Sequence, residues 1–216
     1  MKDIPVFTGA HGIATLVLAQ IPWSGCGYVL VRSVWDDAAA FLEECLGFCR
    51  ACGAERVYAT WELEDLPAEH AYDMIAMEVA KAALPEGATM EVEELTEENS
   101  GAFLAIYNQC FQTVPGAASY SQKDIERLLG EETAYLASVD GEYAAVAEIS
   151  KKGLEAVAVL PEHKGLGYAL TRTVLEKVPS TVIELKVAST NTRAIGLYER
   201  LGFKSCGILS RWWKLM

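Results

Sequence analysis

Apolar residues in the second half of the chain follow first the pattern of a strand and then that of a helix. Residues 157–160 form a short apolar run, and a turn containing Gly165 and Gly167 follows it. Beyond the turn an apolar residue recurs at every fourth position, at Leu166, Leu170, Val174 and Val178. This spacing is typical of one face of a helix. The stretch therefore predicts a strand, a glycine-bent corner, and a helix that begins in or just after the corner.

The predicted corner has the chemistry of an anion site. Glycine lets the backbone bend sharply or approach a ligand closely, and the first N–H groups of a helix have no partner within it. These groups and the helix dipole favour a phosphate, and Lys164 adds a cation. The pattern lacks the third glycine of a dinucleotide-binding fingerprint and the Lys-Ser/Thr of a P-loop. By itself it indicates either a pyrophosphate cradle or an ordinary strand-to-helix turn.

A second strand and helix follow, and the two units together resemble a known superfamily. Residues 182–187 predict a strand, and residues 191–203 read Asn-x-x-Ala-x-x-Leu-Tyr-Glu-x-Leu-Gly-Phe. This phrase resembles motif B of the GCN5-related N-acetyltransferases, the GNAT superfamily. Residues 159–169, which read Val-x-Pro-x-x-Lys-Gly-x-Gly-x-Ala, resemble motif A of the same superfamily. The resemblance covers roughly residues 89–216.

The resemblance implies an α+β fold, with a mixed, largely antiparallel GNAT-type sheet flanked by helices. Strands are predicted at 133–139 and 142–150, around the hairpin sequence Asp140-Gly141. Ser121 and Asp124 resemble a capping box for a short helix. Residues 89–216 are therefore expected to form a catalytic GNAT N-acetyltransferase domain.

The first 88 residues repeat the same order of elements in a weaker form. Strands are predicted at 12–19, 28–34 and 56–61, with a helix before the third, and Pro67 precedes an apolar stripe that predicts another helix through residue 83. At the corner, Trp35-Asp36-Asp37 stands where the later half has its glycines, and the two acids would repel a pyrophosphate. We therefore expect residues 1–88 to be a smaller, degenerate GNAT-like α/β domain without a cofactor, joined through a linker at 84–88.

The helix between the second and third of these strands carries three cysteines with a suggestive spacing. Cys45, Cys49 and Cys52 match the spacing that holds an iron–sulfur cluster in radical enzymes dependent on S-adenosylmethionine. They also share one helical stripe with Phe41, and Asp36 or Asp37 is placed to cap this helix. Cluster-binding cysteines lie on a loop, whereas free cysteine is a common small core residue. We therefore predict that the cysteines pack in a core and bind no metal.

Composition limits the class of protein. The chain has 216 residues, of which 51% are hydrophobic and 22% charged, which suits one large or two small globular domains. Apolar runs are too short to cross a bilayer, and residues 1–5 lack the apolar core of a signal peptide. The six cysteines have no framework spacing, so a cytoplasmic location is expected. The net charge of −12 disfavours nucleic acid and anionic membranes as partners and suits cationic amines.

The resemblance also implies a reaction, in which a primary amine attacks the thioester of acetyl-CoA in a ternary complex without a metal. The developing oxyanion then needs a hydrogen-bond donor, and the departing thiolate needs a proton. In the family, the pantetheine arm lies between the strand before the corner and the next parallel strand. Carried over, backbone groups of Val157 and Val159 hold the arm. The backbone amides expected to hold the pyrophosphate are those of Lys164, Gly165, Leu166, Gly167, Tyr168 and Ala169.

Side-chain roles follow from the same resemblance. Asn191 would hydrogen-bond the arm, and it also suits a helix cap. Tyr198 matches the tyrosine that protonates the thiolate, a role that its ordinary pKa near 10 supports at neutral pH. The general base stays open between Glu155, Glu148 and an ordered water, with Glu155 as our candidate. Three aromatic residues are either acceptor contacts or ordinary packing: Tyr107, Phe111 and Tyr120.

Two other classes of protein remain as alternatives. One is a non-catalytic acyl-CoA sensor or oligomerisation module on the same fold, and Tyr198 beside an intact corner argues against it. The other binds ATP, and the absence of Ser or Thr after Lys164 argues against that. The acceptor, a small-molecule or peptide amine, has no legible motif, and the sequence leaves a homodimer open.

Overall fold

The computed structural model describes residues 5–62 and 65–216 and divides the chain into two compact units. The first unit contains the residues up to Ile75, together with Ala188–Thr190 and Ile208–Met216. The second unit holds Ala76–Val187 and Asn191–Gly207. Residues 1–4, on which the expectation of a missing export signal rests, lie outside the described residues. None of the helices in the described part is long and apolar enough to span a membrane.

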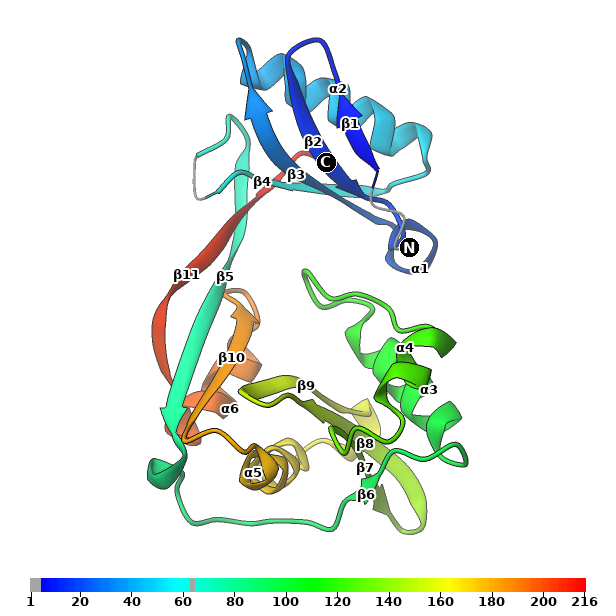
Figure 1. The fold of residues 1–216 in the computed structure, drawn as a ribbon, viewed down its shortest axis with the longest axis vertical. Coiled ribbons are helices and arrows are strands. Elements are labelled where there is room, and N and C mark those ends of the chain that lie inside the picture. Colours follow the sequence, from blue (N-terminus) through cyan, green and yellow to red (C-terminus); the bar gives the residue numbers. More distant parts are fainter. Residues whose placement is uncertain (1–4, 63–64) are drawn as a thin grey trace. The chain divides into compact units, whose positions relative to one another are not determined.

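In the first unit a helix packs on a sheet with the strand order β1-β2-β3-β4-β11 (Figure 1). β3 is antiparallel to β2 and parallel to β4, and β11 is antiparallel to β4. The elements are β1 (Val6–Thr8), β2 (Gly12–Val17), α1 (Ile21–Ser24), β3 (Cys26–Val34), α2 (Ala38–Ala51), β4 (Arg56–Thr60), the first part of β5 (Glu69–Ala80) and the last part of β11 (Lys204–Lys214).

The cysteine-bearing helix α2 supplies the core of this unit, as predicted. Cys45 and Cys49 are fully buried with Phe41 against the strands, and burial raises the pKa of these thiols to about 12 and about 11. Asp37 caps the helix by accepting a hydrogen bond from the Ala40 N–H at 3.0 Å. Thiols with pKa values so high are protonated at neutral pH, which fits core packing.

The helix predicted after Pro67 is wrong, because residues 69–80 form the strand β5. Met77 and Val79 are buried while Glu78 and Ala80 are exposed, which is the two-residue period of a strand. In the sheet, β5 lies between β11 and β10. Membership of the sheet overrides a spacing that also fitted a helix. The repeat in the first half therefore stops at β3-α2-β4.

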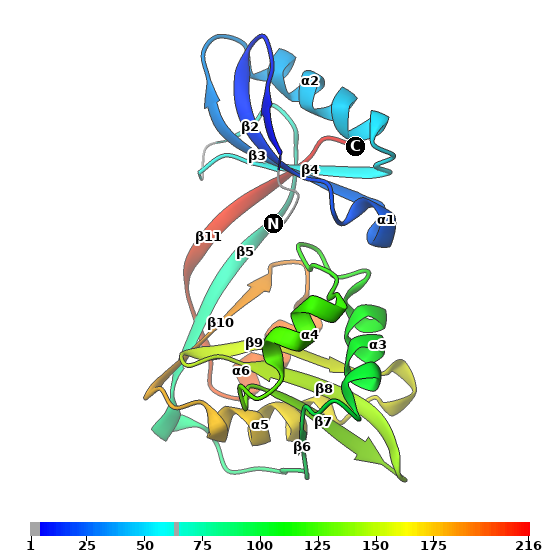
Figure 2. The same ribbon diagram turned by 45° about the vertical axis from the view of Figure 1, so that its right-hand side comes forward.

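The second unit contains the strand order β5-β10-β9-β8-β7-β6, with the start of β11 beside β5 (Figures 1 and 2). β7, β8 and β9 are antiparallel, and β10 is parallel to β9. The further elements are β6 (Glu93–Glu94), α3 (Ser100–Phe111), α4 (Gln122–Leu128), β7 (Ala134–Val139), β8 (Glu142–Ile149), β9 (Gly153–Val159), α5 (Gly167–Lys177), β10 (Val182–Ala188) and α6 (Thr192–Arg200).

Helices cover both faces of this second sheet. Ala156 and Ala158 of β9 belong to a core with α3 and α4, whereas Val159 lies on the side of α5, near Gly167. The predicted hairpin is confirmed, with positive φ at Asp140 (53°) and Gly141 (86°). The Ser121–Asp124 capping box is also present. The fold is thus the mixed, largely antiparallel α+β arrangement that the sequence predicts.

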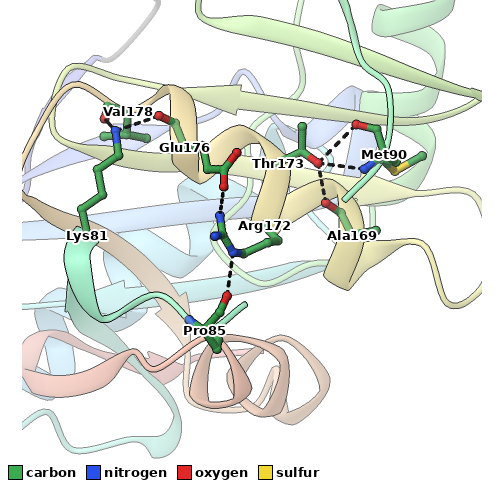
Figure 3. Close-up of polar contacts among 8 residues, drawn as sticks. All are labelled: Lys81, Pro85, Met90, Ala169, Arg172, Thr173, Glu176 and Val178. Atoms are coloured by element: carbon green, nitrogen blue, oxygen red, sulfur yellow. Dashed lines mark hydrogen bonds and ion pairs between the residues drawn. The ribbon is translucent and has the colours of Figure 1, made fainter. Parts of the chain in front are cut away.

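The segment from Lys81 to Met90 is fixed to α5, as Figure 3 shows. Lys81 Nζ donates to the carbonyls of Glu176 (2.7 Å) and Val178 (2.5 Å) at the end of the helix. Arg172 Nε donates to the Pro85 carbonyl at 2.8 Å, and the hydroxyl of Thr173 bonds both backbone groups of Met90. Residues 84–88, expected as the linker between domains, therefore lie along the second unit. The units divide at Ile75, within β5, whereas the boundary was expected after residue 88.

Candidate active site

The glycine corner connects β9 to α5 with an uncapped helix start. A 3₁₀ turn at Pro161–His163 follows β9, Gly165 has a φ of 115°, and α5 begins at Gly167. The Leu170 N–H donates to the Leu166 carbonyl at 2.9 Å as a first helical bond, so the preceding amides have no intrahelical acceptor. No side chain in the described part of the chain caps this helix. The corner thus presents free N–H groups, as expected of an anion site.

Beside the corner, the parallel strands β9 and β10 stay paired for only two residues. The pairs are Gly153 with Glu184 and Leu154 with Leu185. Beyond them, residues 156–159 of β9 pair with β8 on one side and have no ladder partner in β10. Backbone groups along this edge, including those of Val157 and Val159, are therefore available to a ligand.

Gly153 lies where β9 and β10 come closest together. A Cβ atom at this position would lie 1.9 Å from the carbonyl oxygen of Glu184, a distance that no side chain tolerates. In the sequence, this position is a glycine that follows two lysines. Its structural role depends on contact with a strand some thirty residues later and has no local signal.

α6, which carries Tyr198, packs beside the same corner. A Cβ atom placed at Gly167 would lie 3.7 Å from the Leu197 side chain of α6. The Arg200 guanidinium lies 5.6 Å from the centre of the Tyr168 ring. The Tyr198 ring packs 5.9 Å from that of Phe203. Burial raises the pKa of Tyr198 to about 12, so the phenol remains protonated well above neutral pH.

Asn191 caps α6, and its side chain accepts a hydrogen bond from the Ala194 N–H at 3.2 Å. This confirms the capping role that the sequence indicated. The expected hydrogen bond to a pantetheine arm is a separate matter and stays a prediction. The cap places Asn191 just after the end of β10.

The two candidate bases lie on adjacent strands, near a bulge. Glu148 pairs with Ala156, and Ile149 pairs with Leu154, so Glu155 has no partner in β8. The side chains of β9 still alternate through the bulge. Leu154, Ala156 and Ala158 are buried, whereas Val157 and Val159 are partly buried on the side of Glu155. Glu155 is exposed and Glu148 is 5% exposed. The charge of Glu155 contributes to a raised pKa of Glu148, whose main cause is burial.

The three aromatic candidates form one stack beside Glu148. The Tyr107 ring lies 3.9 Å from that of Tyr120 and 4.5 Å from that of Phe111, measured between centres. The Tyr120 hydroxyl donates a short hydrogen bond to Glu148. Tyr107, on α3, is buried in the core, whereas Tyr120 is half-buried. We expected these three residues to be acceptor contacts or ordinary packing, but no sequence pattern predicted the Tyr120–Glu148 bond.

The corresponding corner of the first unit has an acidic, capped helix start. β3 and β4 pair from Cys26–Arg56 to Leu30–Thr60, and residues 31–34 of β3 continue without a ladder partner in β4. Asp37 caps the start of α2, and Asp36 beside it bonds the His11 ring at 2.7 Å. This corner therefore shares the open strand edge of the later corner and differs from it in the side-chain cap and the two acids.

An uncapped, glycine-bent helix start beside two diverging parallel strands is the site expected of an acyltransferase that uses coenzyme A. The chain belongs to the Acetyltransferase (GNAT) family, whose profile matches residues 92–203, just over half of the sequence. That family uses acetyl-CoA as its co-substrate. No group of three potential metal ligands occurs within residues 5–62 and 65–216.

Similar proteins agree with this assignment. A mycothiol acetyltransferase from Streptomyces griseus subsp. griseus is 31% identical over 146 residues, which are 60% of this chain and 47% of that protein. The chain thus spans about half the length of this relative.

Solved structures show the same fold at low sequence identity. A conserved protein of unknown function from Staphylococcus epidermidis has a TM-score of 0.61 at 13% identity, covering 99% of this chain and 94% of its own. A GNAT-family acetyltransferase from Colwellia psychrerythraea has a TM-score of 0.55 at 12% identity, with 98% and 84% covered. A tandem GNAT protein from the clavulanic acid biosynthesis pathway has a TM-score of 0.53 at 15% identity, covering 96% of this chain and 79% of its own.

Proposed function

We propose that this protein transfers an acetyl group from acetyl-CoA to a primary amine by direct attack in a ternary complex. The observation that carries the proposal is the β9–β10 ladder, which ends after two pairs beside the uncapped start of α5. This arrangement gives a pantetheine arm an open strand edge and gives a diphosphate free helix amides. The name of the relative from Streptomyces supports acetyl as the transferred group.

Backbone groups hold the coenzyme in this proposal. Val157 and Val159 pair with the arm, Asn191 adds a hydrogen bond near the end of β10, and an amide of β9 polarises the thioester carbonyl. The diphosphate binds the amides from Lys164 through Gly165, Leu166, Gly167 and Tyr168 to Ala169. Gly165 supports this role because its φ of 115° disfavours any side chain.

Tyr198 is the proposed general acid, which protonates the CoA thiolate as the carbon–sulfur bond breaks. Its raised pKa keeps the proton available, and the packing of α6 on the start of α5 supports its position. The amine must also lose a proton, and two carboxylates are candidates to receive it. Glu155 is the exposed candidate on the bulge, and Glu148 is the buried one.

We also propose that the catalytic domain expected at residues 89–216 is the second unit, and that the degenerate, GNAT-like domain expected at residues 1–88 is the first unit. The capped, acidic start of α2 supports this division of roles. The amine acceptor itself is a small molecule or a peptide.

The test is release of free thiol when the protein is mixed with acetyl-CoA and a panel of primary amines. Release that depends on the amine, with acetyl amide formed in equal amount, is the expected result. Coenzyme A binding without turnover on any amine would instead indicate an acyl-CoA sensor. ATP binding without coenzyme A binding would reject the coenzyme site.

A further inference from the structure

Tyr120 and Glu148 form a hydrogen-bonded pair between a loop and the sheet of the second unit. The Tyr120 hydroxyl donates to Glu148 Oε2 in a short bond. Tyr120 lies in the loop between α3 and α4, whereas Glu148 lies on β8, so the pair joins segments 28 residues apart.

α3 fixes Tyr120 at two points. The side chain of Asn108 donates to the Tyr120 carbonyl at 3.0 Å and accepts from the Tyr120 N–H at 2.8 Å. The neighbouring Tyr107 stacks on the Tyr120 ring at an interplanar angle of 15°. The hydroxyl of Tyr120 is thus held in one place by both backbone and ring contacts.

Glu148 lies on β8, next to the part of β9 that has an open edge. It lies directly opposite Ala156 in the β8–β9 ladder, and opposed residues of an antiparallel pair share one face. Ala156 begins the stretch of β9 that has no partner in β10. The carboxylate therefore lies one strand away from the proposed position of the thioester.

Groups on β9, on α4 and in the loop that holds Tyr120 change the pKa of Glu148. Burial is the main cause of its raised pKa, and Glu155 of β9 and Asp124 of α4 raise the pKa further. The bond from Tyr120 and the charge of Arg127 on α4 act in the opposite direction. Tyr107 of α3 completes the surroundings, and burial raises its pKa to about 12, so it remains neutral. A carboxylate with a raised pKa is a better proton acceptor at neutral pH.

We propose that Tyr120 and Glu148 form a proton relay that removes the proton of the acceptor amine. This proposal deepens, and rests on, the proposed acetyl transfer, and it selects Glu148 over Glu155 as the final proton acceptor. The half-buried Tyr120 contacts the amine, and the buried Glu148 acts through it.

In the relay, the acceptor reacts as its neutral amine, after its ammonium form has lost one proton to solvent. The nitrogen forms a bond to the thioester carbonyl carbon, the carbonyl electron pair moves to oxygen, and the nitrogen gives its second proton to Tyr120 Oη. The original hydroxyl proton of Tyr120 moves to Glu148 Oε2 at the same time. The carbon–sulfur bond breaks, its electron pair goes to sulfur, and Tyr198 protonates the thiolate. Glu148 and Tyr198 return to their starting states by exchange with solvent after the products leave.

The test compares Tyr120→Phe, Glu148→Gln and the double variant by the pH dependence of kcat/KM for the best amine of the panel. In the wild type, kcat/KM should fall as the pH drops through the raised pKa of Glu148, because protonated Glu148 accepts no proton. Each single variant should lose about 10²–10³-fold in kcat/KM and lose this acid limb. The double variant should be no worse than either single one, because both changes break one relay.

The chain provides a matched control in Tyr143, whose hydroxyl donates to the exposed Glu93 at 2.9 Å. Tyr143→Phe removes the same kind of bond and should leave the rate and the acid limb unchanged. Glu155→Gln should retain the limb. Glu148→Gln keeps the shape and an acceptor oxygen, so it tests the relay even if Tyr120→Phe fails to fold.

The outcomes separate this proposal from the proposed function. Turnover by the wild type together with an unchanged acid limb in Glu148→Gln would overturn the relay and leave acetyl transfer intact. Loss of the limb in Glu155→Gln instead would assign the proton to Glu155 and also overturn the relay. A wild type that binds acetyl-CoA but never releases thiol would overturn both.

Discussion

Tyr198→Phe should lower kcat for acetyl transfer by about 10²–10⁴-fold, the usual contribution of a general acid. The variant keeps the ring that packs on Phe203 and removes only the oxygen and its proton. Affinity for acetyl-CoA should stay unchanged, because the coenzyme is held by backbone groups. Product formation in stopped assays measures kcat, and calorimetry measures the affinity for acetyl-CoA.

The wild type should show no basic limb from Tyr198 below about pH 11. Its pKa is raised to about 12, so the acid form persists through the working range and is lost only as the pH rises through that value. Tyr143→Phe is the control for a lost tyrosine hydroxyl. An unchanged kcat in Tyr198→Phe would remove this residue from the mechanism.

Gly153→Ala should destabilise the second unit by about 3 kcal/mol, at the upper end of the cost of overpacking. The new Cβ would lie 1.9 Å from the Glu184 carbonyl oxygen and 2.7 Å from its carbon. Both atoms belong to the backbone, so relief requires β9 and β10 to move apart where they are paired. The same movement should weaken coenzyme binding, since the opening between the strands starts at this point.

Urea unfolding followed by far-ultraviolet circular dichroism measures this loss of stability. Gly101→Ala is the control, because a Cβ there meets nothing within 4 Å and alanine favours the helix. It should be neutral or slightly stabilising. Equal stability of Gly153→Ala and the wild type would mean that the close contact of the two strands is not required.

The corner and the helix after it were predictable because their signals are local. Gly165 bends the chain, and apolar residues at every fourth position mark the buried face of α5. The hairpin at Asp140-Gly141 and the cap at Asp37 depend likewise on neighbouring residues. Motifs A and B added the coenzyme, which the corner alone did not specify.

The features missed from sequence depend on distant contacts. Residues 69–80 fit a helical spacing, and only their place between β11 and β10 makes them a strand. The bulge beside Glu155 arises from the pairing of β9 with β8. The Tyr120–Glu148 bond and the close approach at Gly153 join segments that no local pattern connects.

The most direct measurement is a crystal structure of the protein soaked with coenzyme A at a saturating concentration. We predict diphosphate oxygens at about 3 Å from main-chain N–H groups of residues 164–169, with the pantetheine arm along the unpaired edge of β9. A fully occupied coenzyme bound elsewhere, or a corner that stays empty at saturation, would contradict the account.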